Sequence, residues 1–266
     1  MFPFRNILIP DHSVNAEAAL KYATAFAQHG QGQVVSFSVP DAKTDLASKI
    51  AQAAIDHDID LITVALRDRN RLTRAFGSSL DEDIIAESPC AVLAIRPPQR
   101  DFIHGESEIR LKRMLLATNF RPSSVAATQL ATQMANQLGA ELHAVYVIGD
   151  YIEQISVMFP EGGLAVLTRL RSYVQERMAH LSRGGGATHI AEGRPYQEIV
   201  KLADRLQVDL IVIGTAVHGS LFGSSHVLGS EIERVIRNAP CPVLCVPAAR
   251  AVTPLPALVT QIVPQT

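Results

Sequence analysis

The sequence predicts two tandem α/β domains, each with a doubly wound parallel sheet, and the first domain is shortened. Its short apolar runs are continuous rather than alternating, which is typical of strands covered on both faces. Helical segments lie between these runs, and the order strand, helix, strand indicates right-handed crossovers in a parallel sheet. The pattern also repeats along a chain of 266 residues, a length that accommodates two domains of about 130 residues each.

The repeat begins with a strand and a helix in each half. Residues 6–13 form an apolar run that ends in a polar turn, and a helix is expected at 16–28. Residues 113–120 repeat this run and lead into a helix expected at 125–138. The two helices share a motif, in which residues 23–27 (ATAFA) align with residues 131–135 (ATQMA).

The ends of the two halves also correspond. An apolar strand at 60–64 matches one at 209–213. A Pro-Cys pair then precedes the last strand of each half, with strands expected at 92–95 and 243–246 and helices before them at 80–87 and 231–238. Four matching segments in the same order indicate a duplication.

The second half carries an insertion between its second and penultimate strands. We expect a loop at 149–163, an amphipathic helix at 164–181 and a short strand at 188–191. Apolar side chains at helical spacing predict a stripe that faces the core. These side chains are Leu167, Leu170, Val174, Met178 and Leu181.

The domain boundaries follow from this organisation. Residues 1–98 form a shortened, degenerate first domain, and residues 109–250 form a full second domain. The polar stretch 99–108 is interpreted as a linker. The proline-containing tail, 251–266, is expected to be extended.

The composition limits the function classes. A net charge of −2 provides no global basic field for nucleic acid. No apolar run reaches the roughly 18 residues that span a bilayer, and no signal peptide fits the N-terminus. The three cysteines are too few and too irregularly spaced for a disulfide framework or a zinc site. We therefore expect a soluble cytoplasmic protein that binds neither nucleic acid nor membrane.

A glycine-rich loop follows the strand at 210–213. It contains four glycines and several hydroxyls ahead of a helix, a composition suited to holding phosphate oxygens on backbone N–H groups. A flexible surface loop is the alternative. The loop is not a P-loop, since Ser220 stands where the lysine is required, and no dinucleotide fingerprint follows the strand at 113–117.

The spacing of these glycines resembles the nucleotide motif of the universal stress protein family. Gly219, nine intervening residues and Gly229-Ser230 are similar to the second half of that motif, and residues 192–195, 209–215 and 239–244 are also similar to the family. The resemblance covers nearly all of residues 110–247 and, in shortened form, residues 4–97. It implies an adenine nucleotide α-hydrolase-like fold.

The resemblance also implies a ligand and a site. Some family members bind ATP or AMP and others bind neither, so the hypothesis here is an adenine nucleotide, with Mg²⁺ as its companion ion. The implied phosphate contacts are Gly214, Gly219, Gly229 and the hydroxyl of Ser230. Residues that would flank the adenosine are Ala117, Thr118 and Asn119, and Val147 would line the base pocket.

The family's usual dimer implies how the halves associate. Members commonly dimerise by pairing their last strands. In a tandem chain this implies pairing of residues 92–95 with residues 243–246 within one chain, with a homodimer as a further option.

Several positions depart from the family pattern. Ala216 stands where the first glycine is expected, as if two residues were inserted after Gly214, and Asn119 replaces the usual acid. The first half keeps Asp11 but has lost the glycine-rich start of its loop, so that only Gly77-Ser78-Ser79 remains. We therefore expect the first half to be a degenerate structural partner.

Other reactive side chains have ordinary explanations. His218 either contacts phosphate or is a solvated loop histidine, and both interpretations stay open. Asp11, His12 and Ser13 are adjacent and cannot converge as a hydrolytic triad. The cysteines are expected to be buried apolar side chains, with redox sensing as the alternative.

Three functions compete at this point. The first is a stress-response module that binds ATP or another adenine nucleotide. The second is a scaffold without nucleotide that binds a protein partner through the acidic helix at 80–87 or through the tail. The third is an enzyme, at most a weak ATPase, but the sequence supplies no clear general base or magnesium ligands.

Overall fold

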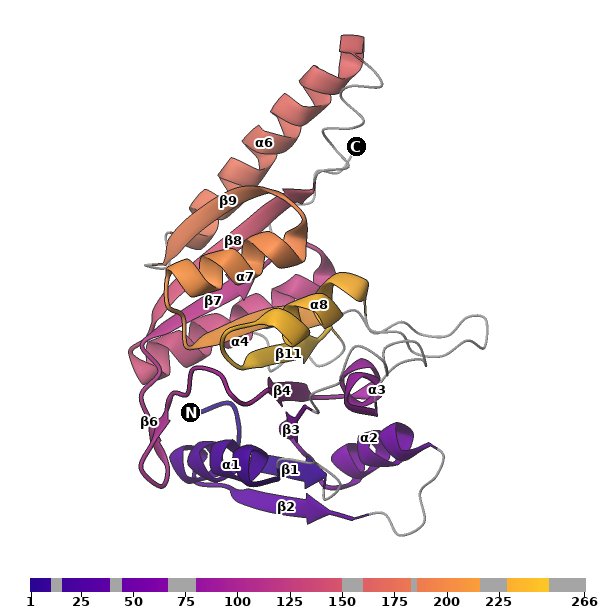
Figure 1. The fold of residues 1–266 in the computed structure, drawn as a ribbon, viewed down its shortest axis with the longest axis vertical. Coiled ribbons are helices and arrows are strands. Elements are labelled where there is room, and N and C mark those ends of the chain that lie inside the picture. Colours follow the sequence, from indigo (N-terminus) through magenta and orange to yellow (C-terminus); the bar gives the residue numbers. More distant parts are fainter. Residues whose placement is uncertain are drawn as a thin grey trace.

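Helices and strands alternate along the chain in the computed structural model (Figure 1). The structure describes residues 1–10, 16–38, 45–66, 80–149, 160–182, 186–215 and 229–248. The strands are β1 (Asn6–Pro10), β2 (Gln33–Phe37), β3 (Leu61–Ala65), β4 (Ala91–Ile95), β5 (Ile103–His104), β6 (Glu108–Ile109), β7 (Arg113–Ala117), β8 (Glu141–Gly149), β9 (Ala187–Gly193), β10 (Leu210–Thr215) and β11 (Val243–Pro247). The helices are α1 (Ala16–Gly30), α2 (Leu46–Asp56), α3 (Leu80–Glu87), α4 (Pro122–Leu138), α6 (Pro160–Ser182), α7 (Pro195–Arg205) and α8 (Ser230–Asn238).

Nine of the described strands form one sheet, in the order β2-β1-β3-β4-β11-β10-β7-β8-β9. Neighbouring strands within each half are parallel. The halves join through the antiparallel pair β4 and β11, in which Val92 is opposite Cys245 and Ala94 is opposite Val243. The predicted α/β fold class is confirmed, and the last strands pair within the chain as the family resemblance implied.

The two halves repeat the same strand order and the same edge contact. The order β2-β1-β3-β4 in the first half corresponds to β8-β7-β10-β11 in the second. Asp60 Oδ2 accepts a hydrogen bond from the backbone N–H of Asn6 at 3.1 Å. Asp209 Oδ2 accepts the equivalent bond from Arg113 at 2.9 Å. In each half, one aspartate side chain thus accepts a hydrogen bond from the backbone N–H at the start of the first strand.

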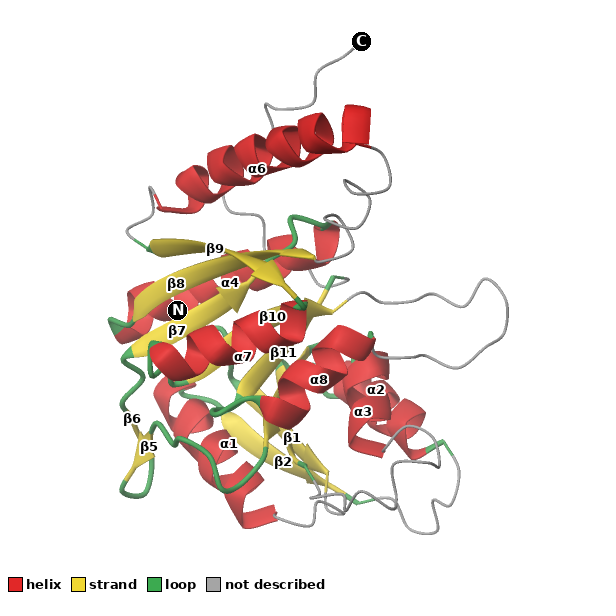
Figure 2. Ribbon diagram, turned by 45° about the horizontal axis from the view of Figure 1, so that its top comes forward, coloured by secondary structure: helices red, strands yellow, loops and turns green. Residues whose placement is uncertain are grey.

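The second half has a helix and a strand that the described part of the first half lacks. α6 packs over β8 and β9, and β9 extends the sheet beyond β8 (Figures 1 and 2). The expected apolar stripe is confirmed at Val174 and Met178, which are fully or almost fully buried, and Leu170 and Leu181 pack against the same core. The side chain of Leu167 lies outside the described residues.

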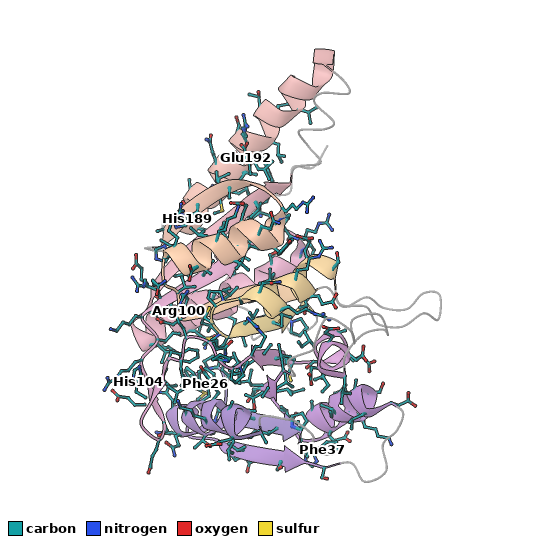
Figure 3. All side chains as sticks on the ribbon, in the orientation of Figure 1. Phe26, Phe37, Arg100, His104, His189 and Glu192 are labelled. Carbon is teal, nitrogen blue, oxygen red and sulfur yellow. The ribbon has the colours of Figure 1, made fainter. Side chains whose placement is uncertain are left out.

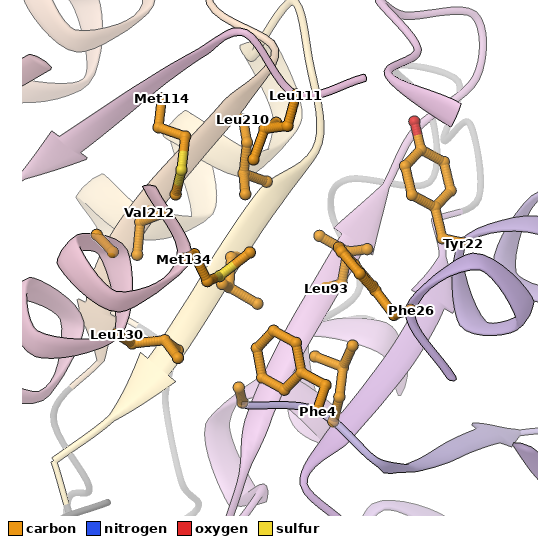
Figure 4. Packing of buried hydrophobic residues seen from close by; sticks show 14 of the residues in the cluster. Phe4, Tyr22, Phe26, Leu93, Leu111, Met114, Leu130, Met134, Leu210 and Val212 are labelled. Atoms are coloured by element: carbon orange, nitrogen blue, oxygen red, sulfur yellow. The ribbon is translucent and has the colours of Figure 1, made fainter. Parts of the chain in front are cut away.

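Each face of the sheet carries one apolar cluster that runs through both halves. The cluster under α1, α4 and α6 joins Phe4, Phe26 and Leu93 of the first half to Met134 and Val212 of the second (Figure 4). The cluster under α2, α3, α7 and α8 likewise contains residues of both halves. Because the core is shared, the halves stabilise each other.

The expected linker is an ordered connection that contacts both halves. It contains the hairpin β5–β6 and the buried side chain of Phe102. Asp101 accepts a hydrogen bond from Tyr22 Oη at 2.9 Å and pairs with Lys21 of α1. Arg100 donates to the carbonyl oxygen of Val208, just beyond α7, at 2.9 Å (Figure 3).

The sequence analysis left some described elements unassigned. These are β2, α2, α7 and the hairpin β5–β6. In the described ranges, every helix is too short or too polar to cross a lipid bilayer.

Candidate functional site

The carboxyl ends of β8, β7 and β10 lie next to one another in the sheet. β7 lies between β8 and β10 in the sheet. The chain reaches β8 from β7 through α4, and it reaches β10 through α7. α4 and α7 cover opposite faces of the sheet. In doubly wound sheets, ligands generally bind beyond the carboxyl ends of the strands at a reversal of this kind.

Residues 117–119 form the end of β7 and the turn that follows it. Ala117 pairs with both Ile213 and Val145, so it lies between β10 and β8. Thr118 is buried, and its N–H donates to the Val145 carbonyl at 3.0 Å. Asn119 is the exposed side chain of the three.

Asn119 shapes the start of α4. Its Oδ1 accepts hydrogen bonds from the N–H of Arg121 at 3.0 Å and from Ser124 Oγ at 2.7 Å. In return, Ser124 Oγ accepts from the Asn119 N–H at 3.2 Å. The carbonyl end of this amide is therefore held by α4, and the exposed Nδ2 group is the end that can donate to a ligand.

Val147 lies where β8 extends past its neighbour. The last residue of β7, Ala117, is opposite Val145, and β8 continues to Gly149. Val147 is half-buried and packs against the cluster under α7 and α8. It therefore offers an apolar surface beside residues 117–119, where the adenosine was expected.

Gly214 has a packing role. A β-carbon at this position would lie 2.2 Å from the backbone oxygen of Ser123 and 3.0 Å from the nitrogen of Ser124. The first turn of α4 thus passes directly over the end of β10. This close contact by itself explains why residue 214 is a glycine, without the predicted role as a phosphate contact.

Gly229 and Ser230 form the open N-terminus of α8. Both are exposed, and a β-carbon at Gly229 would have only Ile232 Cδ1 nearby, at 3.9 Å. Because α8 connects the parallel strands β10 and β11, its N-terminus faces the carboxyl edge of the sheet. No described side chain caps this first turn, and the N–H groups at a helix N-terminus carry a partial positive charge that suits an anion.

The centre of the glycine-rich loop lies outside the described residues. This applies to Gly219, Ala216 and His218, to Gly77 in the corresponding loop of the first half, and to Asp11 after β1. The described part of the candidate site therefore consists of residues 117–119, Val147, Gly229 and Ser230.

The sequence analysis did not identify two polar residues that support this edge. Ser124 holds Asn119, and its position two residues after Pro122 at the helix start was the available signal. Glu231 Oε2 accepts from the N–H of Tyr196 at 3.0 Å and so connects the first turns of α8 and α7. An acid in the first turn of a helix is ordinary, so no sequence signal indicated this link.

The acidic helix α3 contacts the second half of the same chain. Its residues Asp81 and Glu82 are buried. Glu82 Oε1 accepts from Arg237 Nε of α8 at 2.9 Å, and Arg237 Nη2 also donates to Glu233 at 2.8 Å. Burial and the nearby Glu82 raise the pKa of Glu233. This part of the proposed partner surface is thus occupied within the chain.

The three cysteines are free and buried. Burial raises the pKa of both Cys241 and Cys245 to about 12. Since the thiolate is the reactive form, these two side chains behave as small apolar groups, and the redox alternative loses its chemical basis at both positions.

A pair of histidines lies on the face of β8 and β9 that α7 covers. His143 Nδ1 is 3.2 Å from His189 Nε2, so one ring donates and the other accepts. His143 is buried, and its Nε2 lies 3.3 Å from Glu141 Oε1 without the alignment of a hydrogen bond. Burial, the charge of His143 and Arg205 lower the pKa of His189. Within the described ranges, no three His, Cys, Asp or Glu side chains gather as a metal site.

We predict that this pair makes folding stability depend on pH. Since the folded pKa of His189 is lowered, the unfolded chain binds more protons below the ordinary histidine pKa of about 6.5. Stability should therefore fall as the pH drops from about 6.5 and become constant below the folded pKa. Urea denaturation of the wild type and His189→Gln at pH 7.5 and 5.5 tests this. An equal pH dependence in both proteins would contradict the prediction.

The doubly wound fold, with the strand order that the pairing of its two halves produces, agrees with the comparison to known families. The family model for the universal stress protein family matches residues 42–96 and 110–247, which is more than half of the chain. The chain belongs to the universal stress protein family.

Individual relatives agree with this assignment. The chain is 33% identical over 146 residues to universal stress protein MJ0531 from Methanocaldococcus jannaschii, a match that spans 51% of this chain and 81% of the relative. It is also 33% identical over 138 residues to a universal stress protein from Thermus aquaticus, covering 51% and 98%. A crystal structure of a universal stress protein from Archaeoglobus fulgidus covers 92% of this chain and 97% of its own, with a TM-score of 0.61 and 18% identity, and so supports the fold.

Proposed function

We propose that the second half binds an adenine nucleotide, ATP or AMP, at the switch point, and that the chain acts in a stress response as a nucleotide-binding module. The observation that carries the proposal is the open first turn of α8. Gly229 leaves unfilled space in front of exposed N–H groups, on the same edge of the sheet as Asn119 and Val147. These are the elements that a phosphate chain and an adenosine require.

Each residue has a role in this proposal. Val147 provides an apolar surface for the base, and Asn119 Nδ2 donates to the ribose or to a base nitrogen. Ala117 and Thr118 flank the adenosine at the end of β7. The phosphates extend toward Gly229 and Ser230, and Gly219 is the further phosphate contact that the family motif implies. Mg²⁺ would enter with the phosphates as their counter-ion.

The binding experiment is a thermal shift of the whole chain with ATP, AMP and a cytidine nucleotide, each with and without Mg²⁺. At 100 times its dissociation constant a ligand adds about 2.7 kcal/mol of stability. For a protein of this size, that is an increase in melting temperature of roughly 5–10 °C. If millimolar ATP and AMP produce no shift, the scaffold function without nucleotide replaces this proposal.

Gly229→Val should abolish the shift while the unliganded protein stays folded. The φ of Gly229 is −58°, which valine adopts, and the position opens to solvent, so the new side chain fills only the proposed phosphate space. Losing a good N-cap residue costs about 1 kcal/mol. A matched control is Gln197→Val on α7. If Gly229→Val binds ATP as tightly as the control, the proposed phosphate position is wrong.

A further inference from the structure

Phe120 has an unusual backbone conformation for a bulky side chain. Its φ is +59°, in the left-handed region that glycine adopts readily and large side chains rarely adopt. A conformation of this kind persists only where the surrounding structure holds it. Because Phe120 directly follows residues 117–119, its conformation bears on the turn that was expected to flank the adenosine.

The hydrogen bond that orients Asn119 spans this residue. Asn119 Oδ1 accepts from the N–H of Arg121, two residues further along the chain, at 3.0 Å. The N–H of Phe120 donates to Thr118 Oγ1 at 3.2 Å. A change of conformation at residue 120 would move the Arg121 N–H, and Asn119 Oδ1 would have to follow it or lose the bond. The direction of Asn119 Nδ2 therefore depends on the backbone of Phe120.

Side chains of β8 and α6 hold the ring of Phe120. The ring stacks on that of Tyr146 in β8, with the centroids 5.1 Å apart and 20° between the planes. From α6, the guanidinium carbon of Arg177 lies over the ring, 5.1 Å from its centroid. Tyr173 of α6 meets the ring edge-on at 6.3 Å. Aromatic stacking and a cation over the ring face stabilise this position, which offsets the cost of the left-handed backbone.

Burial alone does not explain why the ring stays in place. Phe120 is half-buried at the border of the cluster under α1, α4 and α6. Arg177 is exposed, and Tyr173 is 50% exposed. Contacts at such a border are made and broken more easily than contacts in the core. The cation of α6 is therefore a determinant of the ring position rather than one wall of a rigid core.

The helix that supplies this cation belongs to the second half. α6 lies between β8 and β9 in the chain and packs over both strands (Figures 1 and 2). Buried Val174 and Met178 fix it to the sheet, and Tyr173 and Arg177 precede them by one residue each. Tyr173 and Arg177 are four residues apart, so they lie on one side of the helix. The described part of the first half has no equivalent helix.

We propose that Arg177 and Phe120 are positioning residues of the nucleotide site, an inference that rests on the proposed function. Arg177 holds the Phe120 ring against Tyr146. The held ring keeps the backbone in its left-handed conformation, and this conformation directs Asn119 Nδ2 toward the ligand. Neither positioning residue has to touch the nucleotide. α6 thereby raises nucleotide affinity from outside the site.

Two measurements on the whole chain test the proposal. Isothermal titration calorimetry gives the affinity for ATP and AMP, and ¹⁵N NMR relaxation gives the mobility of the Asn119 side-chain amide without nucleotide. Arg177→Met keeps a long side chain and removes the cation. We expect the dissociation constants to rise about two- to fivefold and the amide to become more mobile. Arg169→Met, at an exposed position two turns earlier on α6, is the matched control and should change neither.

A double-mutant cycle separates positioning from general support of the fold. Glycine adopts the left-handed conformation without a ring to hold it, so Phe120→Gly should keep the turn and make it independent of Arg177. Arg177→Met should then have no further effect on nucleotide affinity in the Phe120→Gly background. Phe120→Ala also removes the ring but retains the backbone cost, so it should bind nucleotide more weakly than Phe120→Gly.

The outcomes distinguish this inference from the proposed function. If Arg177→Met changes neither the nucleotide affinity nor the mobility of the Asn119 amide, Arg177 is not a positioning residue. If its effect is equally large in the Phe120→Gly background, Arg177 does not act through the Phe120 ring and the inference is wrong. If the wild type binds neither ATP nor AMP, the proposed function fails, and the mobility of the Asn119 amide alone decides whether Arg177 sets the turn.

Discussion

Gly214→Ala is expected to lower the free energy of unfolding by about 3 kcal/mol, although it adds one methyl group. That methyl group would lie 2.2 Å from the Ser123 oxygen and 2.6 Å from its carbonyl carbon. Both are backbone atoms, so relief requires α4 to shift away from β10 and disturbs the buried Ala127 and Leu130. The melting temperature should fall by roughly 6–12 °C in differential scanning calorimetry.

Gly229→Ala is the matched control for this substitution. The same methyl group is added 15 residues further along the chain, where the nearest atom is 3.9 Å away. Its cost should stay at about 1 kcal/mol or less, as for a poorer N-cap residue. If the two variants melt at the same temperature, the close approach of α4 to Gly214 is not what requires the glycine.

Arg237→Met is expected to destabilise the chain by about 2–4 kcal/mol. The side chain of Glu82 is 9% exposed. At the contact between α3 and α8, the guanidinium of Arg237 forms ion pairs with the carboxylates of both Glu82 and Glu233. Without the guanidinium, the carboxylates of Glu82 and Glu233, which come from opposite halves, lose the cation that they share. The cost is lower than for a fully buried pair because Arg237 itself is 28% exposed.

The pH dependence of this variant provides the sharper measurement. A buried carboxylate that loses its cation has a raised pKa in the folded state, so the folded variant binds protons that the unfolded chain does not. The stability difference from the wild type should therefore shrink between pH 7.5 and 5. Lys201→Met removes an exposed pair with Glu198 and should cost about 0.5 kcal/mol or less at both pH values. A constant difference for Arg237→Met would contradict the proposed charge balance.

The interpretation of Gly214 shows a limit of motif analysis. Glycines that bind phosphate and glycines that allow close packing both follow strands in this fold. Gly214 and Gly229 therefore look alike in the sequence. Their surroundings differ because the first turn of α4, about 90 residues earlier in the chain, covers one and not the other. A local sequence pattern around Gly214 cannot predict this contact with α4, because the two segments are far apart in the sequence.

Edge elements were difficult to recognise for a related reason. The buried strands β3 and β4 have continuous apolar runs, and these were predicted. β2 has the pattern QVVSF with two exposed residues, because an edge strand is only partly covered and its apolar signal is weaker.

The sequence by itself determined the duplication, the parallel α/β class and the family motif, because these depend on local apolar periodicity and on matching segments in the same order. Only the tertiary structure decided which polar groups meet. Glu82 and Arg237 are 155 residues apart, and Asn119 Oδ1 is turned toward Ser124. Such contacts depend on how the halves join at β4 and β11 and on how α4 enters the sheet. Burial and charge pairing at these junctions arise from packing between distant segments, which no stretch of sequence specifies alone.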